Sequence, residues 1–414
     1  MKTTAPLAAA LALAMTGHAP ETPSLALARD AGAWILAQGP PAGLDLYHGA
    51  AGVVWFLCEL GAATGDPAVA RDARDRADAL VAALEGEADC GLYSGLGGVG
   101  FALRRAFELT GEPRYRDGAR RAAALIRQRA VPAGSGIEWP GQGYDVISGS
   151  AGIGLHLLWE ARKEGDPASR ELAEKAGRRL LELGIPAGSG TKWAAATDTP
   201  MVMPNFSHGT AGVAYFLATL GQETGRREFL DAALGGARYL TSIARTAGDT
   251  ALVYHHEGDG EDLYYWSWCH GPAGTARLFY RLYAVTGDCA WLEWAQKGAR
   301  ALLASGLPES EPPGWWDNVG PCCGHAGVAE LLLGLGEPRH LELARRITAY
   351  LSSRATCDAE GARWVQAEHR VHPELREAQT GYMQGAAGVG MWLLRADALE
   401  RGTAGPAVLP DSPF

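Results

Sequence analysis

The sequence predicts an all-α fold made of seven helical hairpins. A short motif, Gly-x-(Ala/Gly)-Gly, occurs seven times, and each copy is followed by an apolar helical run. These runs alternate along the chain with amphipathic segments. The apolar helices are expected to pack inside, and the amphipathic helices to cover them with one face in solvent. The leading glycines of the motifs are Gly49, Gly95, Gly149, Gly209, Gly271, Gly324 and Gly385.

The chain begins with a segment, residues 1–23, that has features of an export signal. Lys2 precedes a short apolar run and small residues up to Ala19, although Pro20 is a poor residue after a cleavage site. The alternative is a dispensable N-terminal extension. We therefore expect a cytoplasmic protein unless this segment exports it. No transmembrane span is expected, because no other stretch reaches the ~18 uninterrupted apolar residues that one needs.

The repeats are expected over residues 24–400 and a C-terminal tail over residues 401–414. Inner helices are predicted to start at the motifs, as in residues 213–220. Several end in Thr-Gly-(Glu/Asp), such as residues 64–66, where glycine fits a helix C-terminus. Outer helices are predicted over residues 24–37, 170–183, 228–244, 291–303 and 340–351, among others.

Seven hairpins can stack into an open solenoid or close into a toroid. The inner helices at both ends of the chain carry few charges, so no polar repeat caps either end. The polar residues that precede the glycine motifs converge only if the motifs surround one axis. Both observations favour a closed toroid.

The charge balance excludes one class of partner. Lys and Arg number 37 against 47 for Asp and Glu, which gives a net charge of -10. A nucleic-acid surface needs clustered basic charge, so no nucleic-acid partner is expected.

The fifth and sixth motifs carry cysteines directly before the leading glycine. In the shared frame Cys269 aligns with Cys322, and His270 aligns with Cys323. Three thiols and one imidazole thus directly precede the leading glycines of two equivalent motifs. Thiolates are preferred ligands of Zn²⁺, and three protein ligands with one open position are typical of a catalytic site. The alternative is three thiols without a metal.

With these motifs in hand, the chain resembles the lanthionine synthetase C-like (LanC-like) family from about residue 24 to residue 396. The resemblance rests on the seven glycine motifs and on the stretches 144–149, 206–209, 268–271 and 322–324, which fall in the expected order. It implies an α/α-toroid of seven inner and seven outer helices. It also implies a Zn²⁺-dependent cyclase that adds a cysteine thiol to dehydroalanine or dehydrobutyrine in a precursor peptide and forms a thioether.

The resemblance places the zinc ligands at Cys269, Cys322 and Cys323. Many members have histidine at the third position, whereas a subset shares the Cys-Cys-Gly sequence found here. Some members also have an arginine four residues before the first ligand, where this chain has Tyr265.

The reaction needs a general acid that protonates the α-carbon after the thiol has added. The resemblance implies His208 for this role and Asp145 to orient it, and His270 is expected to stabilise the enolate or relay a proton. Alternatives stay open: Asp145 as a helix cap and His270 as a fourth ligand. His48 and His325 are expected to be helix-cap or core histidines.

The leading functional hypothesis is a stand-alone peptide cyclase whose precursor peptide is dehydrated elsewhere. A dehydratase domain needs several hundred further residues, so a separate dehydratase is expected as a partner. A second hypothesis is the addition of thiols such as glutathione to dehydroamino acids in proteins. A third is a non-catalytic peptide-binding toroid with a structural zinc.

Overall fold

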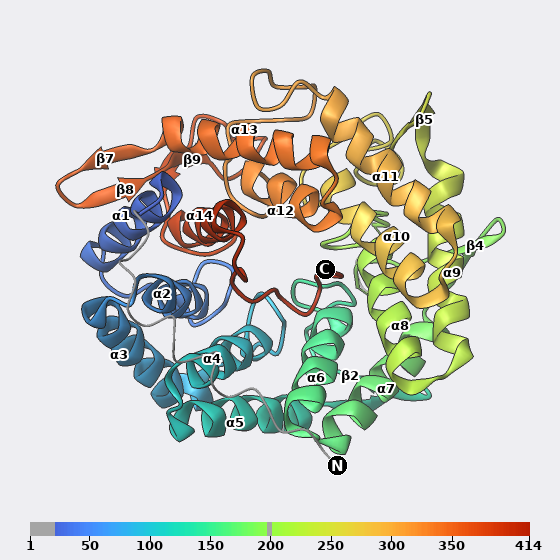
Figure 1. Ribbon diagram of the computed structural model, residues 1–414. Coiled ribbons are helices and arrows are strands. Elements are labelled where there is room, and N and C mark those ends of the chain that lie inside the picture. The colour runs from blue at the N-terminus through green and yellow to red at the C-terminus, as the bar shows by residue number, and fades with distance from the viewer. Residues whose placement is uncertain (1–20, 197–200) are drawn as a thin grey trace, which may run out of the picture.

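Fourteen α-helices alternate around a closed toroid in the computed structural model, which describes residues 21–196 and 201–414 (Figure 1). The predicted all-α toroid is confirmed. The inner helices are α2 (Ala50–Thr64), α4 (Leu96–Thr110), α6 (Ser150–Glu164), α8 (Thr210–Thr224), α10 (Pro272–Thr286), α12 (His325–Leu335) and α14 (Ala386–Arg401). The outer helices are α1 (Pro23–Ala37), α3 (Pro67–Ala83), α5 (Pro113–Arg129), α7 (Pro167–Glu182), α9 (Arg227–Ile243), α11 (Cys289–Ala304) and α13 (Pro338–Arg354). A short 3₁₀ turn, η1 (Leu84–Gly86), follows α3.

The first and last helices close the toroid. Each inner helix from α2 to α12 packs against the outer helix that follows it, whereas α14 packs against α1. The Thr22 hydroxyl donates to Asp397 at 2.6 Å, and the Ser24 hydroxyl donates to Glu400 at 3.2 Å. The expected export signal falls on residues 1–20, outside the described residues, except for its last three positions.

Both glycines of a motif are needed where the preceding loop crosses the start of an inner helix. A Cβ on Gly209 would overlap the Met203 carbonyl oxygen, and a Cβ on Gly212 would overlap the Phe206 carbonyl oxygen. Only glycine therefore lets the loop approach the helix this closely. The predicted glycine ends of the inner helices are also confirmed. All seven are left-handed, with φ between 64° and 73°: Gly65, Gly111, Gly165, Gly225, Gly287, Gly336 and Gly402.

Backbone hydrogen bonds join the seven motif loops into a closed cycle around the axis. A residue just before each leading glycine donates its N–H to the carbonyl of the corresponding residue in a neighbouring loop. The bonds are 2.9 to 3.1 Å long and run Tyr47 to Tyr93, Tyr93 to Ile147, Val146 to Ser207, Ser207 to Cys269, Cys269 to Cys322, Cys322 to Met383, and Met383 to Tyr47. The cycle brings residues far apart in the sequence to one face of the toroid.

Five short antiparallel ribbons, which the sequence analysis did not predict, accompany the helices. Four of them follow an outer helix directly. The pairs are β1 (Val131–Ala133) with β2 (Gly136–Glu138), β3 (Ile185–Ala187) with β4 (Gly190–Lys192), β5 (Arg245–Ala247) with β6 (Thr250–Leu252), β7 (Thr356–Asp358) with β8 (Gly361–Arg363), and β9 (Val365–Ala367) with β10 (Arg376–Ala378). Strands of three residues are too short to show the alternation on which a strand prediction rests.

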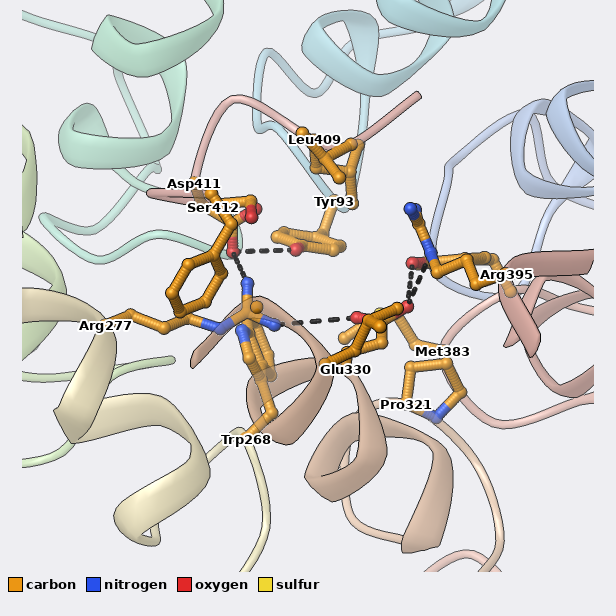
Figure 2. Close-up of a pocket in the computed structure, with 15 residues that line it drawn as sticks. Tyr93, Trp268, Arg277, Pro321, Glu330, Met383, Arg395, Leu409, Asp411 and Ser412 are labelled. Carbon is orange, nitrogen blue, oxygen red and sulfur yellow. Dashed lines mark hydrogen bonds and ion pairs between the residues drawn. The ribbon is translucent and has the colours of Figure 1, made fainter. Parts of the chain in front are cut away.

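The C-terminal tail turns back into the middle of the toroid (Figures 1 and 2). Asp411 is completely buried there, where it accepts a hydrogen bond from the Tyr93 hydroxyl at 3.0 Å and faces Arg277 at 3.6 Å. The Phe414 side chain packs against Gly334 and Tyr280. The tail therefore fills the interior between the inner helices, under the motif loops. In the described part of the chain, every helix is too short or too polar to cross a membrane.

Candidate metal centre and its histidine neighbours

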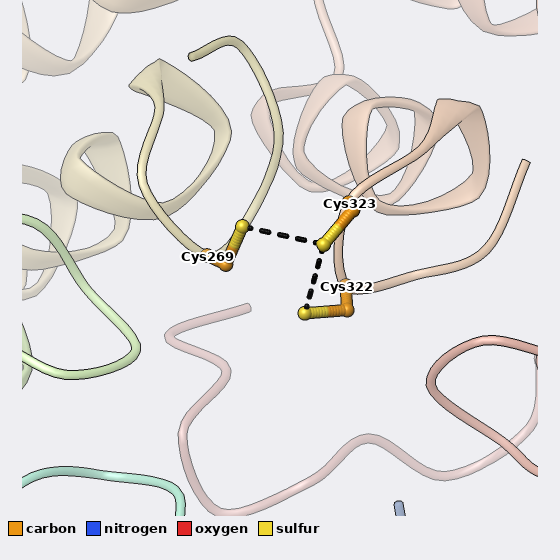
Figure 3. Close-up of side chains that lie close together, drawn as sticks. All are labelled: Cys269, Cys322 and Cys323. Carbon is orange, nitrogen blue, oxygen red and sulfur yellow. Dashed lines mark hydrogen bonds between the residues drawn. The ribbon is translucent and has the colours of Figure 1, made fainter. Parts of the chain in front are cut away.

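The three cysteines singled out in the sequence meet on adjacent motif loops (Figure 3). The Cys269 Sγ lies 3.6 Å from the Cys323 Sγ, which lies 3.4 Å from the Cys322 Sγ. All three sulfurs lie within 4.8 Å of one another. The loops are held in register by the hydrogen bond from the Cys269 N–H to the Cys322 carbonyl, at 3.1 Å.

These spacings fit a metal ion among the sulfurs. Tetrahedral zinc with Zn–S bonds of about 2.3 Å holds its sulfur ligands about 3.8 Å apart. Cys269 and Cys322 are buried, whereas Cys323 is partly exposed, so the cluster lies at the edge of the protein interior. Cys269, Cys322 and Cys323 would give such a metal three protein ligands. The cluster can therefore bind a soft metal ion.

The electrostatics of the sulfurs favour a cation. Burial raises the pKa of Cys269, but hydrogen bonds from Cys322 and Cys323 outweigh burial and lower this pKa well below its ordinary value. The pKa of Cys323 is raised well above its ordinary value, first by the hydrogen bonds with the other two sulfurs and then by burial. Burial and the hydrogen bond with Cys269 likewise raise the pKa of Cys322. One thiolate with two thiols around it is thus favoured, and full ionisation requires a cation among them.

Side chains from neighbouring loops hold the sulfurs in place. The Ser267 hydroxyl lies 3.3 Å from the Cys269 Sγ. The Gln384 Nε2 donates to the Cys323 Sγ at 3.4 Å and to the Tyr47 hydroxyl at 3.1 Å. Sequence analysis did not single out Tyr47 or Gln384. The signal was present, because they precede the leading glycines of the first and seventh motifs, as the cysteines do in the sixth.

The structure brings His208 and Asp145 together. The His208 Nδ1 lies 2.6 Å from the Asp145 Oδ2. The other carboxylate oxygen of Asp145 accepts the backbone N–H groups of Ser148 at 2.8 Å and Gly149 at 2.9 Å. One oxygen of Asp145 thus fixes the loop before α6, which has no side-chain cap, and the other lies against the imidazole of His208. Burial lowers the pKa of His208, but the hydrogen bond and the charge of Asp145 raise it more, to a net value above the ordinary 6.5.

His270 lies beside His208, with 5.9 Å between the centres of the two imidazoles. It is 8% exposed, and its Nε2 is 3.4 Å from the Ser207 hydroxyl. His255, which sequence analysis missed, also stacks on His270, with 4.1 Å between the ring centres. Burial lowers the pKa of His270 to about 3, so this imidazole is neutral. Among the described residues, the cluster of potential ligand atoms contains the three sulfurs and no imidazole nitrogen, which does not support His270 as a fourth ligand.

Tyr265, at the position where some family members have arginine, touches an arginine from another part of the chain. The Arg370 Nε donates to the Tyr265 hydroxyl at 3.1 Å. Arg370 belongs to the segment between β9 and β10, which carries none of the repeated motifs. No pattern in the sequence points to this contact.

The two remaining histidines of the motifs differ from each other. His325 is buried between Trp315 and Tyr350, and its Nδ1 lies 3.1 Å from the Asn318 carbonyl, so the expected core role is confirmed. The side chain of His48 is 49% exposed and its Nε2 lies 3.2 Å from a carboxylate oxygen of Glu368. The expectation that His48 is a cap or core histidine is wrong, because Asp45 braces the start of α2 instead.

Several solved structures share this architecture. Nisin cyclase has a TM-score of 0.65 at 15% identity, over 90% of this chain and 94% of that chain. An inactive variant of the α-1,6-mannanase GH76A of Salegentibacter sp. HEL1_6, in complex with α-1,6-mannotetrose, has a TM-score of 0.52 at 14% identity, over 91% and 99%. An unsaturated glucuronyl hydrolase specific for heparin has a TM-score of 0.51 at 12% identity, over 92% and 98%. At such identities the likeness shows the fold alone.

A family model distinguishes among these toroids. The model described as "Lanthionine synthetase C-like protein" matches residues 40–403, which include all seven motifs, the three cysteines and the pair formed by His208 and Asp145. The chain belongs to the lanthionine synthetase C-like family.

Proposed function

We propose that the protein is a zinc-dependent cyclase that adds a cysteine thiol of a dehydrated precursor peptide to dehydroalanine or dehydrobutyrine. One observation carries the proposal. The Cys323 sulfur lies 3.6 Å from that of Cys269 and 3.4 Å from that of Cys322. Near this cluster lies His208, which is hydrogen-bonded to a carboxylate. Family membership supports a cyclase-type activity.

Cys269, Cys322 and Cys323 would hold the zinc ion, which when bound lowers the pKa of a coordinated thiol and so favours the thiolate. The protein's own residues do the rest. The thiolate sulfur forms a bond to the β-carbon, and the electrons of the carbon–carbon double bond move toward the carbonyl as an enolate. His208 then gives a proton to the α-carbon from Nε2, because Asp145 holds Nδ1. The sum is addition of S–H across a double bond, with nothing oxidised or reduced.

His270 has a supporting place in this proposal. It would stabilise the enolate or relay a proton, because its imidazole lies beside that of His208. The peptide substrate would reach the half-exposed side of His208, whose side chain is 40% exposed. A separate dehydratase would supply the dehydro residues.

The test follows ring formation by mass spectrometry, with a dehydrated, cysteine-containing peptide and zinc-loaded protein. We expect His208→Asn to slow the reaction by about 10²- to 10⁴-fold, the usual contribution of a general acid. Asp145→Asn should slow it by part of that amount. The matched control is Asp89→Asn, because Asp89 braces the second motif loop through Gly91 N–H at 2.6 Å and the Ser94 hydroxyl at 2.9 Å. It should react at the wild-type rate.

Equal losses in Asp145→Asn and Asp89→Asn would mean that the carboxylates only shape the loops. An inactive, zinc-loaded wild type would contradict the cyclase proposal. Replacing the internal cysteine by glutathione in the same assay separates cyclisation from the addition of external thiols.

A further inference from the structure

A second pair of histidine and carboxylate stands on the other side of the cysteine cluster. The residues directly before the leading glycines, from the fourth motif around the toroid to the first, are His208, His270, Cys323, Gln384 and His48. His208 and His48 therefore lie two loops away from Cys323 in opposite directions. Each is hydrogen-bonded to a carboxylate, Asp145 for the former and Glu368 for the latter.

The second pair is fixed from several sides. The His48 Nε2 lies 3.2 Å from Glu368 Oε1, and Glu368 Oε2 accepts a hydrogen bond from Gln379 Nε2 at 2.8 Å. The His48 backbone N–H donates to Asp45 at 2.7 Å. Side chain and backbone are thus both held, and Nδ1 has no protein partner within the described parts of the chain.

The charges around His48 make its imidazole a stronger base. The hydrogen bond with Glu368 is the largest influence and raises the pKa of His48, burial opposes it, and the charges of Glu368, Asp45 and Glu377 raise it further. The same hydrogen bond lowers the pKa of Glu368 to about 2. The carboxylate is therefore ionised at neutral pH and can stabilise an imidazolium beside it.

The residue next to His48 in the chain contacts the cysteine cluster. The His48 imidazole lies 4.5 Å from the Tyr47 ring, and the Tyr47 hydroxyl is hydrogen-bonded to Cys322 and accepts from Gln384. Gln384 in turn donates to the Cys323 Sγ at 3.4 Å. About half of the His48 side chain is exposed, so the imidazole can exchange protons with water. Stability alone does not explain the pair of His48 and Glu368, because exposed ion pairs contribute little to it.

We propose that His48, oriented by Glu368, is the base that removes the proton of the incoming cysteine thiol. The inference rests on the proposed function, in which one proton leaves the substrate thiol and one proton is added at the α-carbon. The S–H bond breaks, the proton passes to Nδ1 of His48 and from there to water, and the electron pair stays on sulfur. His208 supplies the second proton on the far side of the cluster. The two steps are thus divided between two histidines.

The test isolates the first step. Cobalt-loaded protein is mixed in a stopped-flow instrument with a peptide that contains one cysteine and no dehydro residue, and the sulfur-to-cobalt absorption band reports binding of the thiolate. At pH 7.5, where about a tenth of the thiol is already ionised, we expect His48→Asn to bind the peptide up to about 10-fold more slowly than wild type. Glu368→Gln should show a smaller loss. At pH 9, above the thiol pKa of about 8.5, both variants should approach the wild-type rate, because the thiol ionises without help.

The matched control is His372→Asn, an exposed histidine on the same segment between β9 and β10. It should bind at the wild-type rate at both pH values. A wild-type rate in His48→Asn at pH 7.5, or an equal loss at both pH values, would overturn the inference while leaving the proposed function intact. A wild type that binds no thiol at the cobalt centre would overturn both.

Discussion

His156 should make the fold sensitive to mild acid. It lies on α6, is completely buried, and both of its ring nitrogens lack a hydrogen-bond partner among the residues that the structure describes. Burial, and secondly the charge of Arg104, lower its pKa to about 4 from the ordinary 6.5. The imidazole faces Gly100 on α4, where an added Cβ would lie 2.9 Å from it. The perturbation we consider is His156→Leu, which removes the titrating group and keeps an apolar side chain in its place.

The magnitude follows from linkage. The pKa of His156 is lower in the folded protein than in the unfolded chain. As the pH falls below 6.5, the unfolded chain binds a proton at this residue, whereas the folded protein does so only near pH 4, and the folded protein therefore loses stability. Wild type should lose about 2 kcal/mol of unfolding free energy through this group by pH 5, and about 3 kcal/mol by pH 4. His156→Leu loses none of this. Above pH 7 the variant should be as stable as wild type or more stable, because an unpartnered polar group has been replaced.

The assay is urea unfolding of both proteins at pH 7.5 and pH 5, followed by tryptophan fluorescence. Other groups titrate equally in both proteins and cancel in the difference. The control is His372→Leu, whose wild-type side chain is 60% exposed and keeps its hydration on folding. The stability of His156→Leu relative to wild type should rise by about 2 kcal/mol between the two pH values. A difference that does not change with pH would refute the claim that His156 is buried as a neutral imidazole.

Two further predictions concern packing. Gly212→Ala should destabilise the fold by about 3 kcal/mol or more, because its Cβ would overlap the Phe206 carbonyl, whereas Gly86→Ala meets no atom within 4 Å and should change stability by less than about 0.5 kcal/mol. Equal unfolding midpoints for the two variants would contradict the close crossing of loop and helix. Trp193→Phe should lose about 1 to 3 kcal/mol, because the indole N–H donates to the Leu180 carbonyl at 2.7 Å, and unchanged denaturant unfolding would speak against that bond.

Much of the fold could be predicted because the motif glycines have a local physical cause. A loop that crosses a helix N-terminus leaves no room for a side chain at two positions, and Gly209 and Gly212 report this directly. The sequence favoured a closed toroid over an open solenoid but did not show that α1 packs against α14, because contacts between the ends of a chain leave no periodic pattern. The entry of the tail into the interior, where Asp411 meets Arg277, left no such pattern either.

The candidate site also contains residues that the sequence predicts and residues that it does not. Residues next to a motif glycine, such as Cys269, Cys323 and His208, could be found from their position in the repeat. Glu368 and Arg370 could not, because they lie in the segment between β9 and β10, whose place over the site is set by tertiary packing. His48 was misjudged because nothing in the sequence shows its carboxylate partner, which lies 320 positions later.

In the proposed function, three cysteines hold a zinc ion that receives a peptide thiol. The most direct test is the zinc content per chain, measured by inductively coupled plasma mass spectrometry after purification under reducing conditions without chelator. Wild type should hold about one zinc per chain, and so should Cys58→Ala, which removes a buried free cysteine from α2. Cys269→Ala, Cys322→Ala and Cys323→Ala should each lose most of it. A wild type without zinc, or cysteine variants that keep it, would contradict the proposed zinc site.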